Sequence, residues 1–277
     1  MSKLHARGPL TLGNADGALH PDGTGCDLSG LTFIDTYGLV LSAVSALDAI
    51  QQGQAAALTR PERDSVAEHL SYMGIARALD ELGVHHDLPT LDPANRPEVV
   101  TPLQIVARVG DLDGPSDLLH AQLRHKVDPQ VLDALTTALW ELGANAIEHS
   151  GSHAVVAGQV YRRGLAPDHN DKIQIVVGDT GRGVRASFMD TEIHHPADDE
   201  AAIKLALTHM VSSVPDPGRG QGLTTTSKEA VGLQGNFVIR SGVAKLREER
   251  WDYNSLTVPH LPGTVVAVSI PLWPGDS

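Results

Sequence analysis

The sequence has almost no cysteine and few aromatic residues. Cys26 is the single cysteine, so the chain can form no internal disulfide, a composition typical of a reducing cytosol. Aromatic residues make up 4% of the chain, so its cores must be built mainly from Leu, Val, Ile and Ala. No apolar run approaches the ~18 residues of a membrane span, and the N-terminus has no apolar signal-peptide core. We therefore expect a soluble, cytoplasmic protein with no membrane partner.

Positive charge is also in the minority. The 277 residues include 21 Lys and Arg against 34 Asp and Glu, which gives a formal net charge of −13. Such a chain repels the phosphate backbone, so we expect no nucleic-acid partner, although a small basic pocket for one nucleotide stays compatible with this charge. Hydrophobic residues make up 41%, enough to fill cores in two ordinary domains or one large one.

The N-terminal third predicts a small α/β layer over residues 1–95. Residues 1–24 are rich in Gly, Asp and Pro and are expected to be irregular. Short apolar runs and helical apolar stripes then alternate along the chain, as they do in α/β proteins. The predicted elements are a strand over Leu31–Ile34, a helix over Thr36–Gln51, a strand over Ala55–Thr59, a helix from Pro61, and a Pro- and Asp-rich linker over residues 86–97.

Residues 96–277 contain the clearest helix, from about Pro129 to His149. Asp128 is a natural N-cap, Pro129 suits the first helical position, and Gly151 ends the helix. The other expected elements are strands over Leu103–Val109, Ala154–Tyr161, Ile173–Val177, Asn236–Arg240 and Thr264–Pro271, and helices over Pro115–Leu123, after Asp198 and over Thr224–Val231.

Two polar residues of the long helix are candidates for magnesium chemistry. Glu141 and Asn145 are four residues apart, so they lie one above the other, on the face expected to be opposite the apolar stripe. A carboxylate and an amide oxygen suit Mg²⁺ and an attacking water, because Mg²⁺ takes hard oxygen ligands and few protein groups. Taken alone, the pair is better explained as a polar helix face.

An aspartate follows the apolar run Ile173–Val177. In the segment Asp179-Thr-Gly181-Arg-Gly183, the glycines allow positive φ and a close approach of the backbone to a ligand. An ionised Asp only accepts hydrogen bonds and is therefore suited to the amino group of an adenine. The alternative is an ordinary strand-terminating turn, in which Asp and Gly are common.

A second glycine-rich segment, Gly218-Arg219-Gly220-Gln-Gly222, leads into the helix expected around Thr224. Backbone N–H groups at such a helix entry bind phosphate oxygens, and Arg219 adds a charge-assisted contact. The alternative is a flexible loop, and no Gly-Lys-Ser/Thr follows as in a P-loop. Thr264, after Gly263, could contact adenine or a water beside it.

In this order, the segments resemble the GHKL (Bergerat-fold, histidine-kinase-like) ATPases. Glu141-x₃-Asn145 resembles the N box, the segments at Asp179 and Gly218 the two glycine boxes, and Gly263-Thr264 the terminal Thr motif. The resemblance spans roughly residues 100–274. It implies an α/β sandwich with a mixed sheet that binds ATP and Mg²⁺. Asn145 would be a metal ligand, Asp179 the adenine reader and Glu141 the base or water-orienting residue, with residues from about 185 to 217 as a lid. His149 slightly favours the anti-sigma-factor serine-kinase branch.

Residues 25–83 resemble the STAS domain of anti-anti-sigma factors. The segment from Asp27 to Leu39 carries this resemblance, and Thr36 falls at the family's phosphoacceptor position. The neighbouring Tyr37 departs from the family pattern. The favoured alternative is that Asp35 and Thr36 only cap the following helix.

Two functions from different classes follow. The first is an ATP·Mg²⁺-dependent serine/threonine kinase or slow ATPase switch that acts on a STAS-type or sigma-factor-type protein partner. The second is a non-catalytic module in which nucleotide orders the lid and the surface sequesters a regulator. A histidine-kinase role is disfavoured, because no helical hairpin with a phosphoacceptor His precedes the ATP domain. The sequence leaves a homodimer open.

Overall fold

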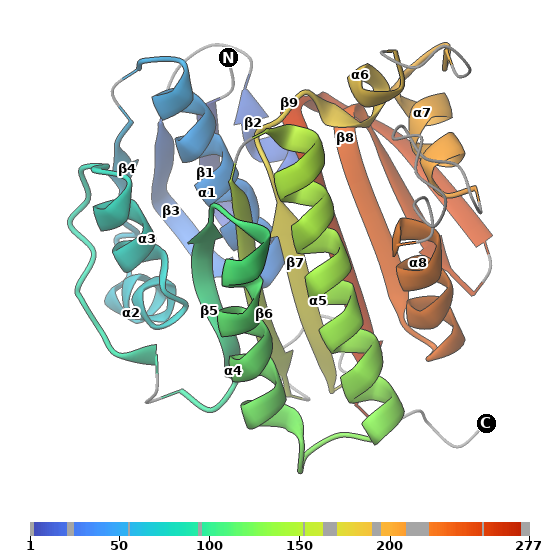
Figure 1. The fold of residues 1–277 in the computed structure, drawn as a ribbon. Coiled ribbons are helices and arrows are strands. Elements are labelled where there is room, and N and C mark those ends of the chain that lie inside the picture. The colour runs from blue at the N-terminus through green and yellow to red at the C-terminus, as the bar shows by residue number, and fades with distance from the viewer. Residues whose placement is uncertain are drawn as a thin grey trace.

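Two β-sheets with helices around them make up this mixed α/β protein (Figure 1). The computed structural model describes residues 3–20, 25–54, 56–93, 96–151, 153–162, 171–189, 195–208, 222–250 and 252–272. None of the helices in these ranges is long and apolar enough to cross a membrane.

The N-terminal sheet is mixed and has the strand order β2-β1-β3-β4. β1 runs antiparallel to β2 and parallel to β3, and β3 runs parallel to β4. The strands are β1 (Lys3–Leu10), β2 (Leu19–His20), β3 (Cys26–Ile34) and β4 (Leu58–Thr59).

β1 shows that the irregular segment expected over residues 1–24 was wrong. Leu4, Ala6 and Leu10 alternate inward along this strand, while Gly8 and Pro9 disguise the pattern in the sequence. The pairing with β3 shifts register between Gly8 and Pro9, which accommodates a residue that lacks an N–H donor.

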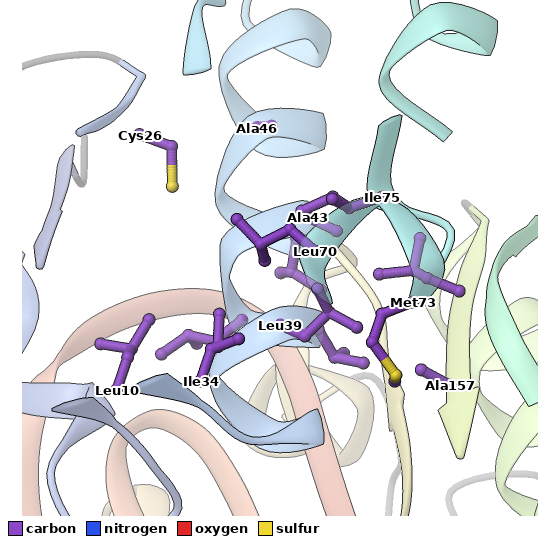
Figure 2. Close-up of a cluster of buried hydrophobic side chains, with 14 of the residues drawn as sticks. Leu10, Cys26, Ile34, Leu39, Ala43, Ala46, Leu70, Met73, Ile75 and Ala157 are labelled. Carbon is purple, nitrogen blue, oxygen red and sulfur yellow. The ribbon is translucent and has the colours of Figure 1, made fainter. Parts of the chain in front are cut away.

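Helix α1 (Thr36–Gln51) lies between the two sheets and matches its predicted bounds. Nearly every residue of it is buried, so it is a core helix. The hydroxyl groups of Ser42 and Ser45 donate to carbonyl oxygens one turn earlier, which satisfies them inside the core. Figure 2 shows Leu39 and Ala43 of α1 among side chains from both parts of the chain, including Met73 and Ala157.

The helix expected from Pro61 is two helices, α2 (Asp64–Tyr72) and α3 (Ile75–Glu81). Gly74 separates them with a φ of +88°, a conformation that glycine adopts without steric cost. Residues 82–93 and 96–98 then lead to β5 without a further helix or long strand.

The C-terminal sheet has the order β5-β6-β7-β9-β8, and every neighbouring pair is antiparallel. The mixed sheet expected for residues 96–277 was therefore wrong. β6 and β7 are consecutive along the chain and pair directly, as do β8 and β9, and consecutive neighbours readily pair antiparallel. The strands are β5 (Val99–Val106), β6 (Ala154–Tyr161), β7 (Lys172–Gly178), β8 (Asn236–Glu249) and β9 (Asp252–Pro271).

Helices cover both faces of this sheet (Figure 1). Val156, Ile175 and Val177 point to the face covered by α5 (Pro129–Ser150), where α4 (Asp113–Leu123) and α8 (Gly222–Gly232) also pack. The alternate residues Val155 and Val176 belong to the other core cluster, which includes α1. The remaining helices, α6 (Gly183–Met189) and α7 (Asp199–Ala206), lie near the β8–β9 end.

Candidate functional site

Helix α5 provides the frame of the candidate site, and its predicted start and end are confirmed. The Asp128 carboxylate accepts a hydrogen bond from the backbone N–H of Gln130 (2.8 Å), Pro129 is the first helical residue, and Gly151 ends the helix with a φ of +63°. The apolar stripe is fully buried against the sheet at Leu135 and Leu139.

Glu141 and Asn145 lie on the flank of α5 that faces the N-terminus of α8. This corrects the expectation that they lie opposite the apolar stripe, because both are half-buried. A Cβ atom at Gly222, the first residue of α8, would be 2.5 Å from Glu141 Oε2 and 3.4 Å from Asn145 Nδ2. The start of α8 therefore approaches both polar side chains as closely as a residue without a side chain allows.

Asp179 follows β7 at the same end of the sheet. Val155, at the start of β6 and just after α5, pairs with Gly178, so the end of β7 lies beside the end of α5. A Cβ at Gly178 would contact Val40 and Val44 of α1. Because successive residues of a strand alternate between faces, Asp179 points to the α5 face.

The Asp179 carboxyl is 7% exposed and lies in a turn of backbone donors. Its Oδ1 accepts a hydrogen bond from the N–H of Gly181 (2.7 Å), and its own N–H donates to the carbonyl of Thr264 (2.9 Å). Burial raises the pKa of Asp179 from 3.8 to about 7, while hydrogen bonds to the carboxyl from the backbone of Gly181 and Thr264 oppose the rise. The group can therefore exchange a proton near neutral pH.

Thr264 lies on β9 next to Asp179 and contacts a residue that the sequence did not point to. Its hydroxyl donates to Ser241 Oγ (3.3 Å), which also receives the N–H of Val184 (2.9 Å) and donates to the carbonyl of Gly263 (3.1 Å). Ser241 could be identified only once the pairing of β8 with β9 opposite Thr264 is known.

Gly263 is required by this arrangement. Its φ is +80°, and a Cβ there would clash with the backbone of Asp179. The glycine therefore lets β9 approach the turn after β7 more closely than any other residue would.

The structure describes only some of the other predicted site residues. Gly181 lies in the turn after Asp179, and Gly183, with a φ of +77°, begins α6 beside Ser241. Gly218, Arg219 and Gly220 lie outside the described residues.

Of the expected lid, the structure describes residues 185–189 and 195–208. As predicted, Asp198 caps a helix: its carboxylate accepts the N–H of Ala201 (2.7 Å) at the start of α7. The lid role stays a prediction.

Thr36, the residue at the STAS phosphoacceptor position, is fully buried. Its N–H and its hydroxyl both form hydrogen bonds with the Tyr161 hydroxyl, at 2.7 and 2.9 Å. Asp35 caps α1 by accepting the N–H of Gly38 (2.9 Å) and also that of Leu12 (2.7 Å). Burial raises the pKa of Asp35 to about 6. The helix-cap interpretation accounts for Asp35, and in this conformation Thr36 is not accessible to a kinase.

The sequence matches no protein-family model, and no match is found among curated proteins. Within the described residues, no three or more His, Cys, Asp or Glu side chains form a group that could hold a metal ion. A metal ion bound by Glu141 and Asn145 would thus need further oxygen ligands from a bound molecule.

Proposed function

We propose that this protein is an ATP·Mg²⁺-binding regulator of the GHKL type that transfers the terminal phosphate to a serine or threonine of a protein partner or hydrolyses it slowly. The partner would be of the STAS or sigma-factor-regulator class, as the two resemblances imply.

One observation supports this proposal above all others. Three segments far apart in the sequence meet at one end and on one face of the C-terminal sheet. They are the flank of α5, the turn after β7, and the part of β9 at Gly263 and Thr264. The N-terminus of α8 approaches the same corner at Gly222, where helix N–H groups and the helix dipole favour a phosphate.

Each side chain at the corner has a proposed role. Asp179, with backbone donors already on its carboxyl, would accept the amino group of adenine when ionised. Glu141 would orient the attacking hydroxyl or water, because its carboxylate lies beside the start of α8. Thr264, next to Asp179, would contact adenine directly or through water.

The oxygen chemistry of the corner fits Mg²⁺. Asn145 offers an amide oxygen and Glu141 a carboxylate on one helix flank, and Mg²⁺ binds through one or two protein oxygens when phosphates and waters complete its shell. When bound, the ion would neutralise charge on the phosphates.

The direct experiment follows the labelled terminal phosphate. The purified chain would be incubated with ATP carrying a labelled γ-phosphate and with Mg²⁺, alone and with co-purifying proteins. Label on a co-purifying protein identifies a kinase, and free labelled phosphate identifies an ATPase. If ATP binds, yet no turnover occurs with any partner, the non-catalytic sequestering module becomes the better description. If ATP does not bind, the proposal is wrong.

Substitution of Glu141 by Gln tests the assigned base. Glu141→Gln keeps the size of the side chain but removes its basicity, so we expect turnover to fall by ~10²–10⁴-fold. ATP binding should change little, because the amide fills the same space beside Gly222. Turnover is measured by phosphate release or phosphotransfer and binding by calorimetry.

Glu148→Gln is the matched control. Glu148 is on the same helix but exposed, so its loss of charge should leave turnover within about twofold of the wild type. Equal turnover in Glu141→Gln and the wild type would remove Glu141 from the mechanism.

A further inference from the structure

A pocket is lined in part by Gly183 and Gly263, the second of which packs against the backbone of Asp179. It is formed between α6, the start of α7 and the β8–β9 pair, and its volume is about 220 Å³. Neither Asp179 nor Asn145 nor Glu141 lines it, whereas Gly183, Ser241 and Gly263 do, so it adjoins the corner proposed for the nucleotide without containing that corner's acidic and amide side chains.

The described residues that line this pocket are mainly cationic and apolar. Arg182 lies just before α6, Arg185 is in its first turn and His260 is on β9, against a single acidic residue among the described lining, Asp199. On a chain with a net charge of −13, a pocket with two guanidinium groups is a local reversal of charge.

The acidic residue is already engaged in a structural contact. Asp199 Oδ2 accepts the N–H of Val243 (2.8 Å), and the positive φ of Gly242 (+60°) lets the β8 backbone reach this carboxylate. Asp199 is also in the first turn of α7, where the helix dipole stabilises its charge. Its charge therefore fixes α7 to β8.

Arg185 remains able to bind a further anion. Its Nη2 donates to the neutral carbonyl oxygen of Ala197 (2.6 Å), which orients the guanidinium without neutralising it. A guanidinium has five N–H donors, so most of them remain for a ligand. Leu261 and Pro262 supply an apolar wall, which strengthens charge–charge contacts by excluding water.

From this geometry we infer that the pocket binds a phosphoryl group, and that the group is carried by a phosphorylated side chain of a protein. A volume of about 220 Å³ is below the roughly 300–1,000 Å³ of sites that enclose a drug-sized ligand, so it fits a side-chain-sized group and not a whole nucleotide. A guanidinium group can donate two parallel hydrogen bonds to two oxygens of one phosphate group. The inference does not depend on the nucleotide proposal.

Calorimetry on the full chain tests the inference. The probes are N-acetyl-phosphoserine amide, unphosphorylated N-acetyl-serine amide and inorganic phosphate. We expect the phosphoserine probe to bind and the serine probe not to bind. Arg185→Gln and Arg182→Gln should each weaken phosphoserine binding about tenfold or more, because each removes a charge-assisted contact.

Two variants control for folding and for bulk charge. Arg185→Lys keeps the positive charge and should retain more affinity than Arg185→Gln. Arg124→Gln removes an exposed arginine just after α4, near the start of α5 and thus at the opposite end of the sheet, and should bind like the wild type. An equal loss of phosphoserine affinity in Arg124→Gln and Arg185→Gln would show that only the net charge of the protein matters, and it would overturn the inference.

The remaining outcomes separate the sources of the phosphoryl group. Phosphoserine that binds more tightly than inorganic phosphate supports a side-chain ligand, whereas equal affinity supports a phosphoryl site filled by free phosphate and overturns the assignment to a protein side chain. If saturating ATP·Mg²⁺ displaces the phosphoserine probe, the pocket belongs to the nucleotide site and the inference is wrong. If the chain binds phosphoserine but not ATP, the proposed function is wrong and the inference about this pocket is supported.

Discussion

At the scale of single residues, Asp179 combines a functional assignment with a cost in stability. Its pKa is about 7 in the folded protein against 3.8 for an unperturbed aspartate, because it is buried. Between these values the folded chain holds a proton that the unfolded chain has released. The higher pKa in the folded state therefore contributes fully to the free energy of unfolding below about pH 4. This contribution is lost as the pH rises through 7, and the total loss is roughly 4 kcal/mol at most.

Replacing Asp179 with Asn should have opposite effects on stability and on binding. The amide side chain would carry no charge to bury, so we expect Asp179→Asn to lose less free energy of unfolding than the wild type between pH 4 and pH 8. ATP affinity at pH 8 should fall roughly ten- to a hundredfold, because a charged acceptor is removed. Urea unfolding at several pH values and calorimetry with ATP·Mg²⁺ measure the two effects.

Wild-type affinity for ATP should itself decline as the pH falls below 7 and Asp179 takes up its proton. Asp133→Asn, an exposed position on α5, is the control and should change neither quantity. Unchanged ATP affinity in Asp179→Asn would refute its role as the adenine reader.

At the scale of elements, local patterns predicted the longest helices and the central strands well, but they missed α6 and joined α2 and α3 into one helix. Helix α1, helix α5 and strand β6 have clear apolar periods, with Asp35 and Asp128 as caps, and their bounds agree with the structure to within a residue. Strand β1, residues 241–249 of β8 and residues 252–263 of β9 were missed. They contain Gly and Pro residues, and register shifts absorb these residues, a feature that only tertiary pairing reveals.

The strand order and the all-antiparallel pairing of the C-terminal sheet could not be read from local patterns either. They depend on which edge the long connection between β7 and β8 reaches. The meeting of Glu141 and Asn145 with Gly222 was implied by family resemblance, whereas the role of Ser241 required the register of β8 against β9.

The contact between helices α5 and α8 gives a prediction at this scale. Gly222→Ala would put a methyl group 2.5 Å from Glu141 Oε2, so the carboxylate must move. Because Ala is a better helix former than Gly and Glu141 is half-buried, we expect the free energy of unfolding to change by no more than about 1 kcal/mol. ATP turnover should fall by roughly tenfold or more, since a displaced Glu141 no longer orients the nucleophile.

Gly232→Ala at the other end of the same helix is the control, because a Cβ there meets no atom within 4 Å. Its turnover should match that of the wild type. Should Gly222→Ala also turn over ATP normally, the start of α8 would have no part in catalysis.

At the scale of the whole molecule, a buried ionic cluster joins the N-terminal segment to the C-terminal sheet. Asp16 forms an ion pair with Arg240, whose Nε lies 2.9 Å from Oδ1, and accepts hydrogen bonds from Lys245 Nζ (2.5 Å) and from the Tyr37 hydroxyl (3.0 Å). Lys245 also lies 4.6 Å from the centre of the Tyr37 ring and donates to the carbonyl of Leu12. One carboxylate thus compensates two buried cations across the contact.

Neutralising that carboxylate should be strongly destabilising. We expect Asp16→Asn to lower the free energy of unfolding by about 3–5 kcal/mol, because it leaves two buried cations without their counter-charge. Chemical denaturation measures the loss. The matched test is Lys245→Met in the Asp16→Asn background, which should recover part of the loss by removing one of the two cations. Simple additivity of the two substitutions would contradict a coupled cluster.

The boundary predicted at residues 95 and 96 stays a prediction, although the two sheets lie on either side of it. One hydrophobic cluster crosses it, from Leu4 and Val40 to Val155 and Ala267. The apolar back of the C-terminal sheet is therefore completed by α1.

This shared hydrophobic cluster limits which domains could be joined to residues 96–272. A rearrangement that joined residues 96–272 to another N-terminal segment would have to supply an equally apolar helix at the same angle, and an acidic group for Arg240 and Lys245. Neither part can therefore be exchanged for another domain without compensating substitutions at the contact.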